Sequence, residues 1–205
     1  MIAVGLTGGI GSGKSTVGKL LVERGAVLVD ADQLAREVVE PGSETLARVV
    51  EQFGPAVLQP DGRLDRQALA SVVFADDAAL SHLNDIMHPP VGALMTERLT
   101  ALDATDAIAV LDIPLLVEGG ARDRYPVAGV LVIDSPVDLA VERLVEHRGM
   151  DRADAERRVA AQASRSERLA QADYIIVNVG TLAELALMVD RAWLWMLALR
   201  DSVGR

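Results

Sequence analysis

The sequence predicts an α/β fold in which helices flank a five-stranded parallel sheet. Five short, nearly continuous apolar runs rich in β-branched residues recur along the 205 residues, as is typical of parallel strands buried on both faces. Helical patterns follow four of these runs directly, and this alternation places helices on both faces of the sheet. A glycine-rich segment follows the first run, at the edge where open parallel sheets bind ligands.

The apolar runs give the expected strands Ile2–Leu6, Val27–Asp30, Ile108–Asp112, Val130–Asp134 and Tyr174–Asn178. Between residues 136 and 148, apolar side chains recur at helical spacing, at Val137, Val141, Leu144 and Val145. A last helix is expected from about Leu182, with a stripe formed by Leu185, Val189 and Trp193.

Two segments break the alternation of strands and helices. Residues 40–103 are predicted to form several helices, separated by "EPGS", "GPAVLQPDGRL" and "MHPP". The charge-rich segment 147–170 is also helical in pattern. Because both segments follow the carboxyl ends of strands, we expect a helical acceptor-binding insertion and a helical lid on a core of residues 1–39, 104–146 and 171–205.

The composition excludes several classes of function. Half of the residues are hydrophobic and only 3% are aromatic, so the core must be aliphatic. A net charge of −10 repels nucleic acids and anionic membranes, and the absence of cysteine excludes disulfides and thiol catalysis. The chain shows no signal-peptide pattern and no apolar stretch of the about 20 residues that cross a bilayer. We therefore expect a cytoplasmic protein, either a monomer or a weak oligomer, with no nucleic-acid or membrane partner.

The segment "GLTGGIGSGKST" predicts a site for the phosphates of a nucleotide. Gly8, four further residues and then Gly13-Lys14-Ser15 match G-x-x-x-x-G-K-[ST], between an expected strand and an expected helix. Glycines let successive N–H groups converge on phosphates, and the helix adds its positive end. Lys14 should reach the β- and γ-phosphates, and the hydroxyl of Ser15 should bind Mg²⁺. The motif thus predicts the P-loop NTPase form of the α/β fold.

Other motifs narrow the kind of nucleotide-binding protein. A GTPase needs an N-K-x-D loop, which is absent, and D-x-x-G occurs only at Asp201–Gly204, at the end of the chain. An "LSGGQ" transporter signature is absent too, and the chain is short for an oligomeric mechanical ATPase. A small phosphotransferase remains, with an acceptor pocket and a lid that excludes water.

Two carboxylates follow the second expected strand. Asp30 ends the strand and suits an N-cap of the next helix. Asp32 lies in the first turn of that helix, where it could accept the proton of an attacking hydroxyl group. The alternative for Asp32 is a solvated acid favoured by the helix dipole.

The chain resembles the dephospho-CoA kinase family in the order and spacing of several motifs. They are "GLTGGIGSGKST", "DAD", "AREVVEPG", "MHP", "PLLVE" and "RVAAQASRSERLAQADYIIVNVG", and together they extend over nearly the whole chain. This family transfers the γ-phosphate of ATP to the 3′-hydroxyl of dephospho-CoA, the last step of coenzyme A synthesis. The resemblance implies a single kinase domain with ATP and Mg²⁺ as cofactors, and ATP and dephospho-CoA as substrates.

The resemblance also implies roles for individual residues. On the ATP side it points to Asn178, which could instead be a plain turn residue, and to the loop residues Gly8, Gly11, Ser12, Gly13, Lys14, Ser15 and Thr16. Asp32 would be the base, with Lys14, Arg143 and Arg148 as further catalytic groups. The family commonly has an arginine four residues after Arg143, where this chain has His147 beside Arg148.

On the acceptor side the resemblance points to Asp32, His88, Leu115, Glu118, Arg158, Gln162 and Arg165. Several of these residues have a simpler alternative. His88 precedes two prolines and could end a helix, and leucines such as Leu115 and Leu116 are often plain core. By their spacing, Arg158, Gln162 and Arg165 would share one helical face, which could be merely solvated.

The leading hypothesis is therefore an ATP-dependent kinase that acts on dephospho-CoA. A kinase for another small nucleoside or nucleotide shares the same core and would differ in the acceptor pocket. A slow nucleotide-binding regulatory module is the alternative outside enzymes.

Overall fold

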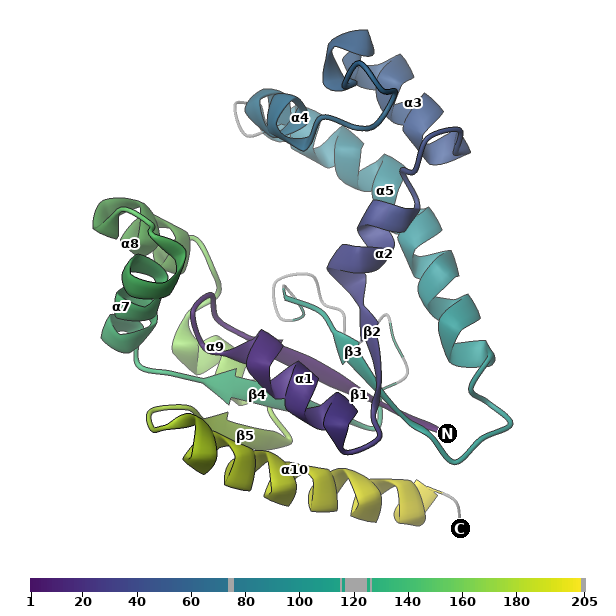
Figure 1. The fold of residues 1–205 in the computed structure, drawn as a ribbon. Coiled ribbons are helices and arrows are strands. Elements are labelled where there is room, and N and C mark those ends of the chain that lie inside the picture. The colour runs from purple at the N-terminus through teal and green to yellow at the C-terminus, as the bar shows by residue number, and fades with distance from the viewer. Residues whose placement is uncertain (74–75, 115, 117–124, 126, 204–205) are drawn as a thin grey trace. The chain divides into compact units, whose positions relative to one another are not determined.

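The computed structural model describes residues 1–73, 76–114, 116, 125 and 127–203 (Figure 1). The strands are β1 (Ile2–Gly8), β2 (Val27–Asp30), β3 (Ile108–Asp112), β4 (Gly129–Asp134) and β5 (Tyr174–Val177). The helices are α1 (Lys14–Glu23), α2 (Ala31–Glu37), α3 (Glu44–Phe53), η1 (Pro55–Val57), α4 (Arg66–Val73), α5 (Asp77–Thr100), α7 (Val137–Arg148), α8 (Arg152–Ala160), α9 (Arg165–Ala170) and α10 (Leu182–Val203). None of the helices in the described ranges is long and apolar enough to span a membrane.

The chain forms two compact units. Unit 1 consists of residues 1–29 and 102–205, and unit 2 consists of residues 30–101. Unit 2 therefore starts at residue 30, whereas the sequence predicted an insertion from about residue 40. The physical reason is that α2 packs against α5 and so belongs with the helices that follow it.

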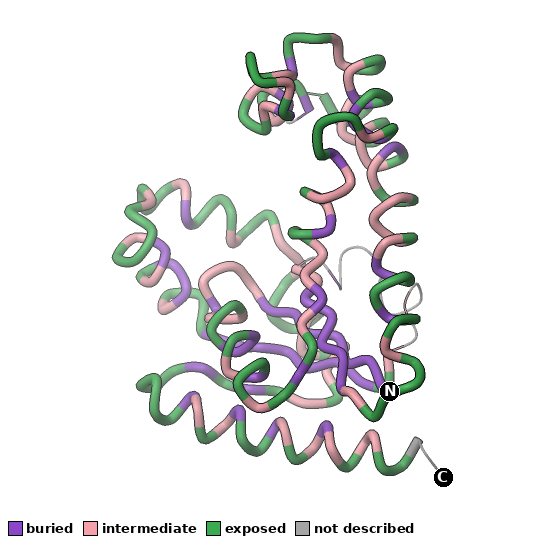
Figure 2. Tube along the Cα trace, turned by 45° about the vertical axis from the view of Figure 1, so that its right-hand side comes forward, coloured by how far each residue is buried: buried purple, intermediate pink, exposed green. Residues whose placement is uncertain are grey.

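The predicted five-stranded parallel sheet is confirmed in unit 1. Its strand order is β2-β3-β1-β4-β5, with β1 in the centre between β3 and β4. The strand bounds agree with the apolar runs to within two residues, and β1 continues to Gly8, directly before the glycine-rich loop. Every residue of β1 is buried, as Figure 2 shows for the central strands.

Helices cover both faces of the sheet. On one face, Leu21 of α1 and Met196 of α10 pack against Leu6 and Ile133 in the main core. On the other face, Leu169 of α9 packs against Leu116, Val130 and Val132. Successive strand residues point to opposite faces, so the buried strands must be apolar at nearly every position.

Unit 2 has a core of its own, made of short amphipathic helices. Buried members of this core come from several elements of the unit: Val39, Leu46, Val49, Val57, Leu64, Leu69, Val73 and Ile86. The predicted breaks at "EPGS" and "GPAVLQPDGRL" are confirmed, since α2, α3 and α4 end or begin there. The side chain of Ser43 accepts from the N–H of Leu46 and so caps α3.

The predicted helix break at "MHPP" is wrong. Helix α5 runs continuously from Asp77 to Thr100 and contains both Pro89 and Pro90. Each proline removes one backbone N–H donor from the helix, which usually ends or kinks it. Here α5 packs against α2, α3 and α4, with Ile86 buried before the prolines and Met95 after them. Tertiary packing before and after the two prolines therefore outweighs the destabilisation that the missing hydrogen bonds cause in the helix.

We expect Pro89→Ala to raise the free energy of unfolding by about 1–2 kcal/mol, because alanine restores the missing N–H within a helix held by packing. Urea denaturation measures the change. Gly92→Ala is the matched control on the same helix, since a Cβ at Gly92 would meet no heavy atom within 4 Å. If Gly92→Ala stabilises the protein and Pro89→Ala destabilises it, the proline itself supports this part of α5.

Candidate active site

The loop between β1 and α1 is shaped by two glycines with positive φ angles. Gly11 and Gly13 have φ angles of 78° and 92°, in the left-handed region that glycine adopts without strain. A Cβ at Gly11 would also lie 2.6 Å from the carbonyl oxygen of Ala140. Among the described residues, no side chain caps the N-terminus of α1. The first N–H groups of α1 and its positive dipole end therefore suit an anion.

Two side chains from outside the loop hold its backbone. Nδ2 of Asn178 donates to the carbonyl oxygen of Ser12 at 2.8 Å, and Asn178 is only 6% exposed. Oε1 of Gln162 accepts from the N–H of Ile10 at 2.8 Å. Through these bonds Asn178 and Gln162 order the loop. From the sequence, Asn178 was expected to contact ATP and Gln162 to contact the acceptor.

A cavity of about 330 Å³ opens beside the loop in unit 1. Arg143 enters it from α7, and its guanidinium group donates to Oγ of Ser135 at 3.3 Å and to Oδ1 of Asn178 at 3.5 Å. His147, at the position where the family commonly has an arginine, and its neighbour Arg148 both line the same cavity as the loop. The cavity thus brings together these predicted ATP-side and catalytic residues: Gly11, Gly13, Thr16, Arg143, Arg148 and Asn178.

Lys14 forms an ion pair with Asp112, a residue that sequence reasoning missed. Asp112 ends β3, is 5% exposed and lies in register beside Leu6 of β1. Asp112 could have been predicted from the sequence, because it is a carboxylate at the end of an apolar strand next to the phosphate loop. The Walker-B aspartate of P-loop proteins lies at this position. The buried carboxylate of Asp112 therefore lies at the start of α1, where Lys14 and Ser15 are the first two residues.

Arg165 forms a bidentate ion pair with Asp134, a second carboxylate that sequence reasoning missed. Nε and Nη2 of Arg165 donate to the carboxylate at 2.8 and 2.6 Å. Asp134 ends β4 and is 4% exposed, and its hydrogen bond and charge raise the pKa of Arg165 above the ordinary value. This pair fastens the start of α9 to the carboxyl end of the sheet, because an unpaired buried carboxylate would be costly.

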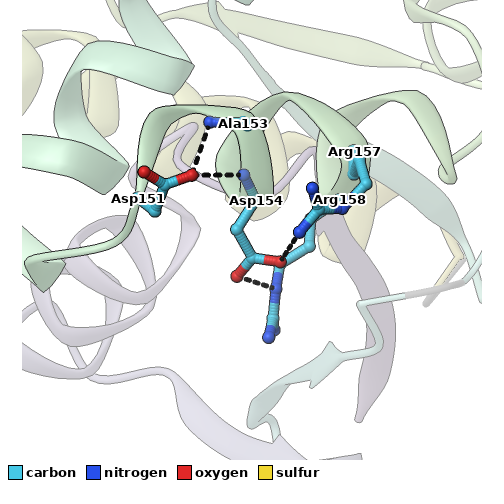
Figure 3. Close-up of polar contacts among 5 residues, drawn as sticks. All are labelled: Asp151, Ala153, Asp154, Arg157 and Arg158. Atoms are coloured by element: carbon cyan, nitrogen blue, oxygen red, sulfur yellow. Dashed lines mark hydrogen bonds and ion pairs between the residues drawn. The ribbon is translucent and has the colours of Figure 1, made fainter.

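The predicted helical face shared by Arg158, Gln162 and Arg165 is wrong. Helix α8 ends at Ala160 and α9 starts anew at Arg165, because Ser164 and Glu167 form a capping box between them. Figure 3 shows Arg158 paired instead with Asp154 on the same helix, at 3.2 Å. Asp154 also pairs with Arg157, and Asp151 caps the start of α8.

Within unit 2, Asp30 and Asp32 take different roles. The carboxylate of Asp30 accepts from the N–H groups of Asp32 and Gln33, which confirms the predicted N-cap of α2. Asp32 is exposed in the first turn of α2, and its carboxylate makes no hydrogen bond or ion pair within the described part of the chain. His88 is exposed within α5, so the alternative that it ends a helix is wrong.

The remaining predictions concern the segment after β3. Leu115 and Glu118 lie outside the described residues. Leu116 is 2% exposed and packs with Val130 and Val132, which confirms its alternative role as core.

Together these features define a class of protein. A glycine-rich loop follows a central parallel strand, its lysine meets an aspartate at the end of the neighbouring strand, and arginines line the adjoining cavity. The fold and the site are those of a P-loop kinase.

The chain belongs to the dephospho-CoA kinase family, whose model matches residues 2–184. It is 51% identical over 193 residues to the dephospho-CoA kinase of Thermobifida fusca (strain YX), covering 94% of this chain and 95% of that protein. TT1252 from Thermus thermophilus is similar in structure, with a TM-score of 0.84 and 36% identity over 96% of this chain and 97% of that one. Dephospho-CoA kinase from Campylobacter jejuni has a TM-score of 0.70 and 26% identity, covering 93% and 94% of the two chains.

We expect Asn178→Asp to weaken ADP binding about tenfold or more, because a carboxylate oxygen would replace the donor that faces the carbonyl oxygen of Ser12. Isothermal titration calorimetry measures the affinity. Asn84→Asp is the matched control, since Asn84 is the other asparagine of the chain and lies on α5 in unit 2. Wild-type affinity in Asn178→Asp would contradict a role for this amide in ordering the loop.

Proposed function

We propose that the protein transfers the γ-phosphate of ATP to the 3′-hydroxyl of dephospho-CoA, giving coenzyme A and ADP. The observation that carries this proposal is a phosphate loop with uncapped N–H groups, in a chain of the dephospho-CoA kinase family. The transferred phosphoryl group carries its charge on equatorial oxygens, so oriented N–H groups and cations supply most of the catalysis.

On the donor side, Lys14 would exchange its ion pair with Asp112 for the β- and γ-phosphates of ATP. Arg143 and Arg148 line the cavity beside the loop and would neutralise the charge that develops on the phosphates. Asn178 and Gln162 would keep the loop in its binding conformation.

The residues present also fit a magnesium ion. Mg²⁺ prefers oxygen ligands and usually takes one or two carboxylates together with substrate phosphates. The hydroxyl of Ser15 and the carboxylate of Asp112 would hold it, since Lys14 next to Ser15 already meets Asp112. When bound, the ion neutralises charge on the β- and γ-phosphates.

On the acceptor side, Asp32 would accept the proton of the 3′-hydroxyl group. Its carboxylate is exposed and has no hydrogen-bond or ion-pair partner among the residues that the structure describes, so it is available as a base. A cytoplasmic location and a monomeric or weakly oligomeric state remain part of the proposal.

A coupled assay of ADP release tests the function. ADP release from ATP should require dephospho-CoA and should stay at background with a panel of nucleosides. Release that depends on another nucleoside instead would identify a different small-molecule kinase, and slow release without any acceptor would identify a regulatory module.

We expect Lys14→Ala to lower kcat/KM about 100-fold or more, because the loop would lose its cation toward the transferred phosphate. The chain offers a matched control, since its second lysine, Lys19, lies exposed on the same helix. Lys19→Ala should keep near-normal turnover in the same assay. Near-normal turnover in Lys14→Ala would contradict the assignment of the loop.

We expect Asp32→Asn to lower kcat by about 10²- to 10⁴-fold while ATP binding stays largely unchanged, because an amide cannot take the proton of the acceptor. Asp77→Asn is the control for a plain dipole role, since Asp77 is an exposed first-turn acid of α5. If Asp32→Asn and Asp77→Asn have equally small effects on kcat and on stability, Asp32 is not the base.

A further inference from the structure

Unit 2 gathers its few positive charges around one cavity. In residues 30–101 the sequence has twelve Asp and Glu side chains, no lysine and only five arginines: Arg36, Arg48, Arg63, Arg66 and Arg98. A cavity of about 250 Å³ is lined by three of these arginines, Arg36, Arg63 and Arg66, together with the apolar residues Val39, Pro41 and Leu64. Such a concentration of guanidinium groups in an acidic unit suits an anionic ligand.

Of the three arginines that line the cavity, two form no ion pair with a carboxylate among the described residues. Within the described residues, Arg36 and Arg66 form no ion pair, whereas Arg63 lies 3.7 Å from Asp61, and Arg98 pairs with Glu37 outside the cavity. Partial burial of its guanidinium group lowers the pKa of Arg66, and the charge of Arg36 lowers it further. Glu40 also lines the cavity and offsets only part of this positive charge.

Arg66 lies at an unfavourable position for a cation on its own helix. Arg66 is the first residue of α4, where the positive end of the helix dipole disfavours a cation. The N-terminus of α4 is already capped by Asp65, whose carboxylate accepts from the N–H groups of Gln67 and Ala68. The charges of Arg36 and Arg66 thus act on each other, and the charges of Glu40 and Asp32 compensate them only in part.

We infer that this cavity binds the diphosphate group of the acceptor, an inference that rests on the proposed function. The proposed base belongs to the same surroundings, because the charge of Asp32 acts on Arg66. Asp32 and Arg36 are four residues apart on α2 and so share one face at a separation of about 6 Å. Guanidinium groups bind phosphate oxygens through paired hydrogen bonds, so Arg36 and Arg66 would fix the ribose with its 3′-hydroxyl at Asp32.

Steady-state kinetics of Arg36→Gln and Arg66→Gln test the inference. Each substitution should raise the KM for dephospho-CoA about tenfold or more, because each removes a charge-assisted contact with the diphosphate group. The KM for ATP and the melting temperature should stay near their wild-type values. Arg48→Gln is the matched control, since Arg48 is exposed on α3 and does not line the cavity.

The outcomes separate this inference from the proposed function. If the wild-type protein phosphorylates dephospho-CoA and both variants keep its KM, the cavity does not bind the acceptor and the inference is overturned. It is also overturned if the variants lose kcat and melting temperature together, since Arg36 and Arg66 would then be structural. If the wild-type protein does not act on dephospho-CoA at all, the proposed function fails first.

Discussion

The site depends on one constraint, a glycine-rich phosphate loop that leads into a helix N-terminus which no side chain of the described residues caps. The other backbone groups of such a loop need hydrogen-bond partners elsewhere in the protein. In unit 1, the amide of Asn178 binds the carbonyl oxygen of Ser12, and Gln162 binds the N–H of Ile10. Both side chains come from the second half of the chain, so the loop near the N-terminus is held by contacts with residues far away in the sequence.

The carboxyl ends of two strands also position side chains around the loop. β3 ends in Asp112, which holds Lys14, and β4 ends in Asp134, which holds Arg165. Buried carboxylates are stable only when they are paired, so each fixes the cation opposite it. In a chain with a net charge of −10, two cavities nevertheless have arginines in their lining. Arg143 and Arg148 line one in unit 1, and Arg36 and Arg66 line the other in unit 2.

The strands and the phosphate loop could be predicted from sequence because their signals are local: continuous apolar runs and a fixed glycine–lysine spacing. The course of α5 through Pro89 and Pro90 could not, because the packing that maintains it comes from helices distant in sequence. The break before Arg165 has a local signal, the capping box of Ser164 and Glu167, although the uncharged, alanine-rich residues 159–163 before it suit a continuous helix. The partners of Asn178 and Gln162 are set by tertiary contacts across more than a hundred residues, which no spacing reveals.

The account claims that the phosphoryl group held by the loop passes to a sugar alcohol and not to water. Phosphorus NMR of the reaction mixture tests this claim directly, because a phosphomonoester on a ribose carbon couples to the proton of that carbon. With ATP and dephospho-CoA, the account predicts one new phosphomonoester signal that matches authentic coenzyme A, formed in equal amount to ADP. Inorganic phosphate as the main product would contradict it.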